Sequence, residues 1–592
     1  MEGRLEAGTS SGRAPLIAGR VKFGASLALV LTCVYFVARC RWTPDSQGNW
    51  AQGNDPMGRW WLSAAIASLP LIVLLLAIGF ARIPAHKAAL IGLVTCLFVA
   101  TTVHHMPVKL ALAAAAYGAA YGIFPICWII IPVLFLFQLT ARSGRLDALK
   151  ESLVGITPDS RLQLVLIAFA LGAFLEGASG FGTPVAVCGA LLVGLGFDPF
   201  QASIATLMAD TAPVAFGSLG IPITTLSAVS GIDSFAISRV VALLLIPFCI
   251  LIPFLLTTSY AGKFRARGVW PPVLLAGSLF ATLQYFLARI AGPNLVDIVA
   301  ALGTIGALLF FLRAWKPAAV YDPQLIELPH QPGSTSLSLH CMWRGWSPWI
   351  ALSLVLALWS IPDFSHFLDA HTTLRLPIPG LHLHIYRTPP VVPHAMAEPA
   401  ILTFNWLSAT GTASMIGATL AGLLIGIRPS MFMDCFKQTL HGIRFTVITI
   451  AAMLAFGFVS RYAGIDAAIG LAFAHTHRLY PFFGTFVGWL GTLSTGSDTS
   501  SNVLFGSLQT VAARQIGVSP VLMCSANTVG GVMGKMIAAP TLVIAATATG
   551  RPGQEGRLLR YLLPRSLALC ALVGLLVILL AYVPGLGSFT SK

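Results

Sequence analysis

Charged residues are scarce in this chain. Asp, Glu, Lys and Arg make up 10% of its 592 positions, whereas hydrophobic residues make up 56%. An average soluble domain contains about 25% charged residues, so this chain has too few to cover the surface of a water-soluble protein of its length. Apolar runs of roughly 18–25 residues recur along it, and a run of this length spans a bilayer as an α-helix. The sequence therefore predicts an all-α polytopic membrane protein.

Cysteine pairs and metal-binding patterns are also missing. The ten cysteines are scattered singly, and none forms a CxxC pair or a Cys/His cluster with zinc spacing. His382 and His384 lie in a stretch rich in Pro and His, but no third ligand follows at a fixed spacing. Single cysteines in apolar runs usually act as small hydrophobic residues. We therefore expect no metal site and no cofactor.

The positive charge does not predict nucleic-acid binding, although the formal net charge is +15. Basic residues gather in short loops, for example at Arg142, Arg145 and Lys150. Short loops rich in Lys and Arg stay on the cytoplasmic side of a membrane. A nucleic-acid groove would need a basic stripe interleaved with aromatic residues, and the sequence has none. The excess of positive charge reflects membrane topology.

The chain divides into two halves joined by a polar connection. We expect about twelve to fourteen membrane segments, some of them re-entrant. A loop rich in Pro and His is predicted on the extracytoplasmic side at 362–399, followed by a membrane span near 401–427. The predicted units are an N-terminal extension at 1–45 with one extra apolar segment, a first half at 46–312 with a motif at 174–222, a polar cytoplasmic connection at 313–346, and a second half at 347–592 with a motif at 488–541.

Two polar, glycine-rich stretches interrupt the apolar sequence, one in each half. The first reads FLEGASGFGTP (174–184) and the second reads LSTGSDTSSN (493–502). A second polar box follows each at a similar distance, at 209–222 and 526–540, which suggests a duplicated unit. Hydrocarbon tolerates such backbone only where it is buried in protein or lines a watery cavity. Small residues also allow close helix packing, but paired interruptions point to the substrate site of a transporter.

Four charged residues lie in or beside these boxes: Glu176, Asp210, Asp498 and Lys535. An ionisable residue at the centre of a bilayer costs at least about 3 kcal/mol on insertion scales, so it indicates function. Lys535 is a natural counter-charge for a substrate carboxylate or for one of the acids. Glu176 is a natural proton site.

Three other acids receive a structural interpretation. Asp233, Asp297 and Asp466 fall where apolar runs begin or end. We expect them at the ends of membrane spans, in a structural role.

The polar boxes resemble those of the L-lactate permease family, the bacterial lactate/glycolate–proton symporters. The resemblance extends from about Trp50 to the C-terminus, although the family usually has Asn where Asp210 stands here. The stretches that carry it are EGASGFGTP (176–184), TAPVAFGSLGIP (211–222), NWLSATGT (405–412), TGSDTSSN (495–502) and ANTVGGVMGKMI (526–537).

This resemblance implies a multi-pass carrier of the bacterial inner membrane that moves a small 2-hydroxymonocarboxylate together with a proton by alternating access. It also implies two inverted repeats with broken or re-entrant helices. The substrate carboxylate is then expected on Lys535 and on backbone N–H groups of the hairpins. The predicted substrate-binding residues are Ser179, Thr183, Ser497, Asn502, Asn527, Thr528 and Lys535, and the predicted proton-coupling residues are Glu176, Asp210 and Asp498.

Other functions remain open from the sequence alone. A sodium-coupled carboxylate transporter would use the Ser/Thr/Asn-rich boxes and Asp498 as oxygen ligands. A more remote alternative is an intramembrane serine protease, because residues 177–180 read GASG and fit a GxSG pattern. Such a serine needs a histidine base within hydrogen-bond reach, yet the histidines after Ser179 lie mainly in loops. The sequence leaves open the choice between lactate and glycolate, and the oligomeric state.

Overall fold

The computed structural model describes residues 49–79, 83–148, 156–178, 180, 182–318, 320–321, 339–359, 361–392 and 394–583. The predicted N-terminal extension (1–45) lies outside these residues, as do Ser179 and part of the predicted connection at 313–346. The division of the chain into these units remains a prediction.

Apolar runs of the first half form helices separated by short turns. A π-helical segment at Gly122–Cys127 joins α5 to α6, and another at Val165–Leu171 joins α8 to α9. The helices are α2 (Trp60–Ala67), α3 (Leu69–Gly79), α4 (Ala85–Thr102), α5 (Val108–Tyr121), α6 (Trp128–Arg142), α8 (Ser160–Leu164), α9 (Gly172–Ala178), α10 (Thr183–Gly194), α11 (Pro199–Ala209), α12 (Gly217–Ser230), α13 (Ser234–Ala266), α14 (Trp270–Ile290) and α15 (Val296–Ala314).

The second half is also mainly helical. Its helices are α16 (Leu339–Trp359), α17 (Pro362–Thr372), α18 (Thr410–Ile425), α19 (Pro429–Ala463), α20 (Ile465–Ala474), α21 (Tyr480–Thr495), α22 (Asp498–Gln515), α23 (Pro520–Lys535), α24 (Ala539–Ala548) and α25 (Glu555–Tyr582).

Local sequence signals determine where the central helices begin. Asp198 accepts a hydrogen bond from the Gln201 N–H and caps α11, whose first residue is Pro199. Ser497 accepts a hydrogen bond from the Ser500 N–H and caps α22. A polar N-cap satisfies a backbone N–H that has no partner within the helix, and proline suits the first helical position.

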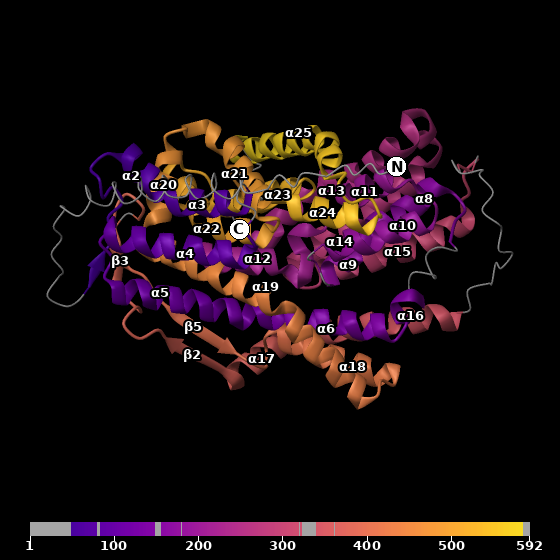
Figure 1. Ribbon diagram of the computed structural model, residues 1–592, viewed down its shortest axis with the longest axis horizontal. Coiled ribbons are helices and arrows are strands. Elements are labelled where there is room, and N and C mark those ends of the chain that lie inside the picture. The colour runs from indigo at the N-terminus through magenta and orange to yellow at the C-terminus, as the bar shows by residue number, and fades with distance from the viewer. Residues whose placement is uncertain are drawn as a thin grey trace, which may run out of the picture.

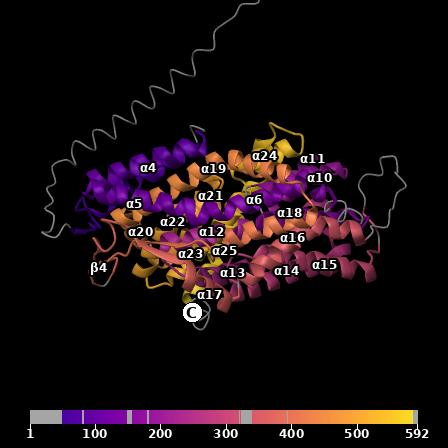
Figure 2. The same ribbon diagram turned by 90° about the horizontal axis from the view of Figure 1, so that it is seen from below.

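The long helices run along the longest axis of the molecule (Figure 1). In both views α10 and α11 of the first half lie towards the right, and α20 of the second half lies towards the left (Figures 1 and 2). Helices α4, α5, α6, α16, α18 and α19 pack on one another in one layer, and α9–α15 with α20–α25 form the other. The interrupted segments of the two halves therefore approach the middle of the molecule from opposite ends.

The membrane class is confirmed. Within the described residues, nine helical segments are long and apolar enough to cross a bilayer, or up to eleven if each of two bent helix pairs counts as one span. Three shorter apolar helices, α10, α18 and α20, accompany them. The relation of the two halves as inverted repeats remains a prediction.

Two short sheets depart from the prediction. Strand β2 (Thr373–Pro377) pairs antiparallel with β5 (Ile401–Asn405), and β3 (Ile385–Arg387) pairs with β1 (Trp50–Ala51) and β4 (Met396–Ala397). The predicted span near 401–427 is therefore wrong at its start, since its helix begins at Thr410. The loop predicted at 362–399 likewise contains α17 and strands. A short apolar run such as ILTFN fits a strand as well as a helix, and periodicity alone cannot distinguish them.

Candidate substrate site

Each half contributes a helical hairpin that ends near the middle of the molecule. Helices α9 and α10 are separated by residues 179–182, and α21 and α22 by residues 496–497. Gly182 and Gly496 adopt left-handed backbone conformations, with φ of 80° and 78°. Glycine takes this conformation without steric cost. The glycines that the sequence analysis singled out thus form the turns of two hairpins.

A second break in the first half separates α11 from α12. The helices on its two sides are bent by 62°. Ser218, Leu219 and Gly220 have positive φ values of 48°, 58° and 74°. A left-handed conformation costs a non-glycine residue on the order of 1–3 kcal/mol, and such strain is found mainly at functional sites. Pro222 follows two residues after Gly220, within α12.

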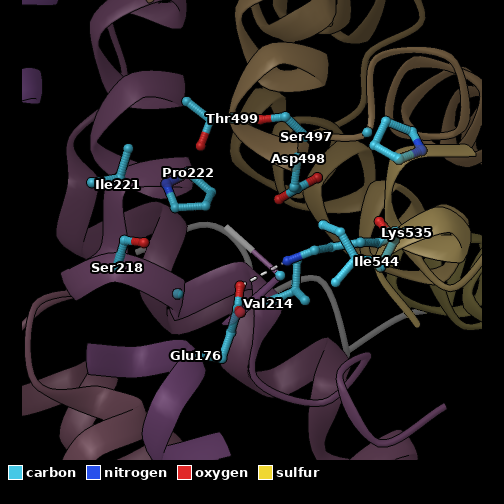
Figure 3. A pocket seen from close by; sticks show the side chains of 15 residues that line it. Glu176, Val214, Ser218, Ile221, Pro222, Ser497, Asp498, Thr499, Lys535 and Ile544 are labelled. Atoms are coloured by element: carbon cyan, nitrogen blue, oxygen red, sulfur yellow. Dashed lines mark hydrogen bonds and ion pairs between the residues drawn. The ribbon is translucent and has the colours of Figure 1, made fainter. Parts of the chain in front are cut away.

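A cavity of about 150 Å³ lies between these breaks. Figure 3 shows that residues of the first half form one wall and residues of the second half the other. The lining residues are Glu176, Gly182, Val214, Gly217, Ser218, Ile221, Pro222, Gly496, Ser497, Asp498, Thr499, Lys535, Pro540, Thr541 and Ile544. The paired interruptions in the sequence thus meet at one cavity.

Lys535 ends α23 and forms two ion pairs at this cavity, of which Figure 3 shows the one with Glu176. Its Nζ atom lies 2.8 Å from Glu176 Oε1 and 3.4 Å from Asp210 Oδ2. The three side chains are at most 9% exposed. Because the lysine belongs to the second half and both acids to the first, the ion pairs connect the two halves.

Glycines leave room for the acidic side chains. A Cβ atom on Gly217 would lie 2.6 Å from Glu176 Oε1, and a Cβ atom on Gly531 would lie 2.1 Å from Asp498 Oδ1. Both distances are shorter than van der Waals contact, so any larger residue would displace the carboxyl group. The glycines therefore determine where Glu176 and Asp498 can lie.

Three helices begin at the cavity wall. Gly182 precedes the first residue of α10, Ser497 precedes that of α22, and Pro540 and Thr541 lie in the first turn of α24. A helix N-terminus carries a partial positive charge and backbone N–H groups that lack a partner within the helix. The cavity combines these with the Lys535 ammonium, an environment that suits an anion.

The structure brings four of the predicted site residues to the cavity wall: Glu176, Ser497, Asp498 and Lys535. Asp210 contacts Lys535 from behind this wall.

Asn502, Asn527 and Thr528 are fully buried and contact one another. Asn502 Oδ1 accepts hydrogen bonds of 3.0 Å from both Asn527 Nδ2 and Thr528 Oγ1. Asn502 Nδ2 donates to the Pro222 carbonyl at 3.1 Å and to Asp498 Oδ2 at 3.5 Å. Asn502, Asn527 and Thr528 are not among the described residues that line the cavity. The hydrogen bonds from Asn527 and Thr528 hold the side-chain amide of Asn502 next to Asp498, which does line it. Their direct contact with substrate remains a prediction.

The two remaining candidates are placed less directly. Thr183 is the first residue of α10 and half-buried, directly after the lining residue Gly182. The role of Ser179 remains a prediction, because this residue lies outside the described part of the chain.

Several cavity residues were not among the predicted ones. Ser218 and Thr499 lie within the quoted motifs, next to a glycine-rich break and to Asp498, so their position could have suggested them. Thr541 and Ile544 lie in an apolar helix whose sequence gives no signal of function. Only the folded arrangement shows that this helix reaches the cavity.

Comparison with known proteins shows the family of this chain. The sequence matches the L-lactate permease family over residues 63–584. The chain belongs to this family. The L-lactate permease of Salmonella typhimurium is 41% identical over 542 residues, which cover 90% of this chain and 98% of that protein. The glycolate permease GlcA of Escherichia coli is 40% identical over 550 residues, with the same coverage.

More distant relatives extend the comparison. The L-lactate permease of Bacillus subtilis is 36% identical over 558 residues, which cover 90% of this chain and 98% of that protein. Among solved structures, the YdaH transporter of Alcanivorax borkumensis covers 80% of this chain and 88% of its own at 16% identity, with a TM-score of 0.41.

Membership in this family makes the protein a multi-pass membrane permease and not an enzyme. The intramembrane protease is therefore not favoured. The cavity is therefore a candidate site for the solute that this permease moves.

Proposed function

We propose that this permease carries small 2-hydroxymonocarboxylates, L-lactate and glycolate, across the bacterial inner membrane together with a proton. The proposal is carried by the position of Lys535 between Glu176 and Asp210 at the wall of a buried cavity. The names of the relatives, L-lactate permease and glycolate permease, supply the class of substrate.

Charge balance at Lys535 accounts for proton coupling. One ammonium cannot neutralise two carboxylates, and an uncompensated buried charge is costly. The empty site is neutral when Glu176 and Asp210 together hold one proton. When a substrate carboxylate takes Lys535, the released acid needs a second proton to keep the site neutral. One anion and one proton therefore enter together, with Asp498 as a further acid at the same cavity.

The size of the cavity suits these substrates. Protein cavities of about 150 Å³ can hold benzene, which has six non-hydrogen atoms. L-Lactate also has six, and glycolate has five. The cavity volume of about 150 Å³ thus matches a single small acid.

The placement of the substrate follows from the polar groups of the wall. Its carboxylate contacts the Lys535 Nζ atom and the N-termini of α22 and α24, where the partial positive charge is concentrated. Its 2-hydroxyl group is within reach of Ser497 and Thr499, which line the same wall. Alternating access then exposes this central site to each side of the membrane in turn.

Uptake into proteoliposomes tests the proposal. Radiolabelled L-lactate and glycolate are offered to reconstituted protein under an inward proton gradient and, separately, under an inward sodium gradient. Accumulation of either acid under the proton gradient alone is the expected result. Accumulation driven only by the sodium gradient would mean that the permease is coupled to sodium ions and not to protons. Absence of uptake by inserted protein would contradict the substrate class.

A further inference from the structure

A fourth acid lies beside the ion-paired cluster, although the sequence suggested only a structural role for it. Asp297 is the second residue of α15 and is 1% exposed. It packs against Gly177, next to Glu176 in the chain, because a Cβ atom on Gly177 would lie 2.7 Å from Asp297 Cβ. The expected helix-end position is correct, but this helix end lies inside the protein beside the substrate site.

One oxygen of Asp297 is held by Gln284 of α14. Gln284 Nε2 lies 3.4 Å from Asp297 Oδ1 and 3.4 Å from the carbonyl oxygen of Ala212, two residues after Asp210. Gln284 Oε1 accepts a hydrogen bond from the Cys249 thiol at 3.3 Å, which directs the amide nitrogen towards Asp297. Gln284 thus connects Asp297 to the turn that carries Asp210.

The other oxygen of Asp297 has no hydrogen-bond partner within the described part of the chain. Among the described residues, Asp297 forms no ion pair, and its buried Oδ2 atom makes no hydrogen bond. A buried carboxylate oxygen without a partner is costly, whereas a protonated carboxyl group carries no charge. The burial of Asp297 and the unpartnered Oδ2 atom therefore favour the protonated form in this conformation.

The titratable groups that face Asp297 are those of the substrate site. Glu176, Asp210 and Lys535 lie close enough to influence its charge, and Cys249 on α13 shares the Gln284 side chain with it. A change of charge at Lys535, such as the arrival of a substrate anion, therefore changes the free energy of ionising Asp297.

We propose that Asp297 is the proton relay of this permease, which holds a proton in the conformation described here and passes it to the pair Glu176 and Asp210. The transfer takes place when alternating access brings the carboxyl groups within hydrogen-bond distance: the O–H bond at Asp297 Oδ2 breaks as an O–H bond forms on the carboxylate that the substrate displaces from Lys535. Asp297 is left as a carboxylate that still accepts the hydrogen bond from Gln284, and it regains a proton from water. This inference rests on the proposed function.

The substitution Asp297→Asn tests the relay, because asparagine keeps the size and the acceptor oxygen but cannot carry the proton. Two measurements on proteoliposomes separate binding from coupling. Counterflow exchanges external labelled L-lactate for internal unlabelled L-lactate at equal pH and needs no net proton movement. Accumulation under an inward proton gradient needs it. Asp297→Asn should keep counterflow but lose accumulation by about tenfold or more.

Two further variants complete the design. Asp233→Asn is the matched control, because Asp233 is an exposed N-cap of α13 and asparagine caps a helix equally well. It should leave both measurements within about twofold of the unsubstituted protein. Asp297→Glu keeps a titratable group and should restore part of the accumulation.

The outcomes distinguish the two proposals. Accumulation by Asp297→Asn at the level of the unsubstituted protein would overturn the relay and leave the proposed function intact. Loss of counterflow in both Asp297→Asn and Asp297→Glu would assign Asp297 to folding or binding and would also overturn the relay. Absence of counterflow in the unsubstituted protein would instead contradict the proposed function.

Discussion

Lys535 Nζ lies 2.8 Å from Glu176 Oε1, although 359 positions separate the two residues in the chain. Each residue belongs to a different half, and each lies beside a helix break that faces the same cavity. A substrate carboxylate that takes Lys535 has to displace Glu176 or Asp210. The contact links the two halves, and in the proposed function it is also the place where substrate and proton exchange.

Removing the positive charge should abolish transport. Lys535→Gln leaves two buried acids without a cation and the substrate without its counter-charge. Removing one partner of a buried ion pair costs about 3–5 kcal/mol, which corresponds to more than about a hundredfold in an equilibrium constant. Initial rates of L-lactate uptake measure the effect. Lys437→Gln is the matched control, since Lys437 is exposed on α19. Near-normal uptake by inserted Lys535→Gln protein would refute the assignment.

A methyl group at Gly217 should weaken transport without changing any charge. The new Cβ atom would lie 2.6 Å from Glu176 Oε1 and would push the carboxylate away from Lys535. A misplacement of about 1 Å can cost on the order of a hundredfold in rate. We expect a fall in uptake of about 10–100-fold. Gly194→Ala, with nothing within 4 Å of its Cβ atom, should behave like the unsubstituted protein. Equal rates for both variants would show that Glu176 need not contact Lys535.

Asn502 should matter for stability as well as for transport. Asn502→Ala leaves Asn527 Nδ2 and Thr528 Oγ1 without their shared acceptor in a fully buried region. An unsatisfied buried polar group costs about 1–3 kcal/mol, so the melting temperature in detergent should fall. A variant with unchanged melting temperature and a raised KM for L-lactate would instead place Asn502 in direct contact with substrate.

A second ion cluster should stabilise the protein only above acidic pH. Glu398 contacts Arg387 and lies 2.6 Å from an Arg461 nitrogen. Burial raises the pKa of Glu398, but Arg461 and Arg387 outweigh this effect and hold the pKa below its ordinary value. A carboxyl whose pKa is depressed by folding stabilises the fold above its unfolded pKa, and this contribution is lost as the pH falls through the folded value.

The test of this cluster is a pair of melting curves. Glu398→Gln should melt at a lower temperature than the unsubstituted protein at neutral pH, and the difference should shrink as the pH falls below the ordinary range of a glutamate. Asp434→Asn, at an exposed position of α19, serves as the control. A difference that grows with acidity would have the wrong sign for this account.

The sequence predicted the membrane class and the residues near the cavity better than it predicted their contacts. The breaks at 179–182 and 496–497 could be predicted, because a polar, glycine-rich stretch inside an apolar run indicates a break in a membrane helix. The ion-pair partners of Lys535 could not be predicted. Whether Lys535 pairs with Glu176 or with Asp498 depends on how the two halves pack against each other. Asp297 was expected at a helix end, and it is the second residue of α15. Its burial beside Gly177 could not be predicted, because a helix end looks alike in sequence whether it faces solvent or the protein interior. Ile544 could not be predicted as a cavity residue, because an apolar residue in an apolar helix looks the same in sequence whether it faces lipid or a cavity.

The central claim is that one anion and one proton move together through the site of Lys535, Glu176 and Asp210. The most direct test measures L-lactate accumulation in proteoliposomes under a pH gradient without membrane potential, and under a membrane potential without pH gradient. The account predicts accumulation in the first case, none in the second, and one proton taken up per lactate. Accumulation driven by the membrane potential alone, or lactate uptake without proton uptake, would contradict it.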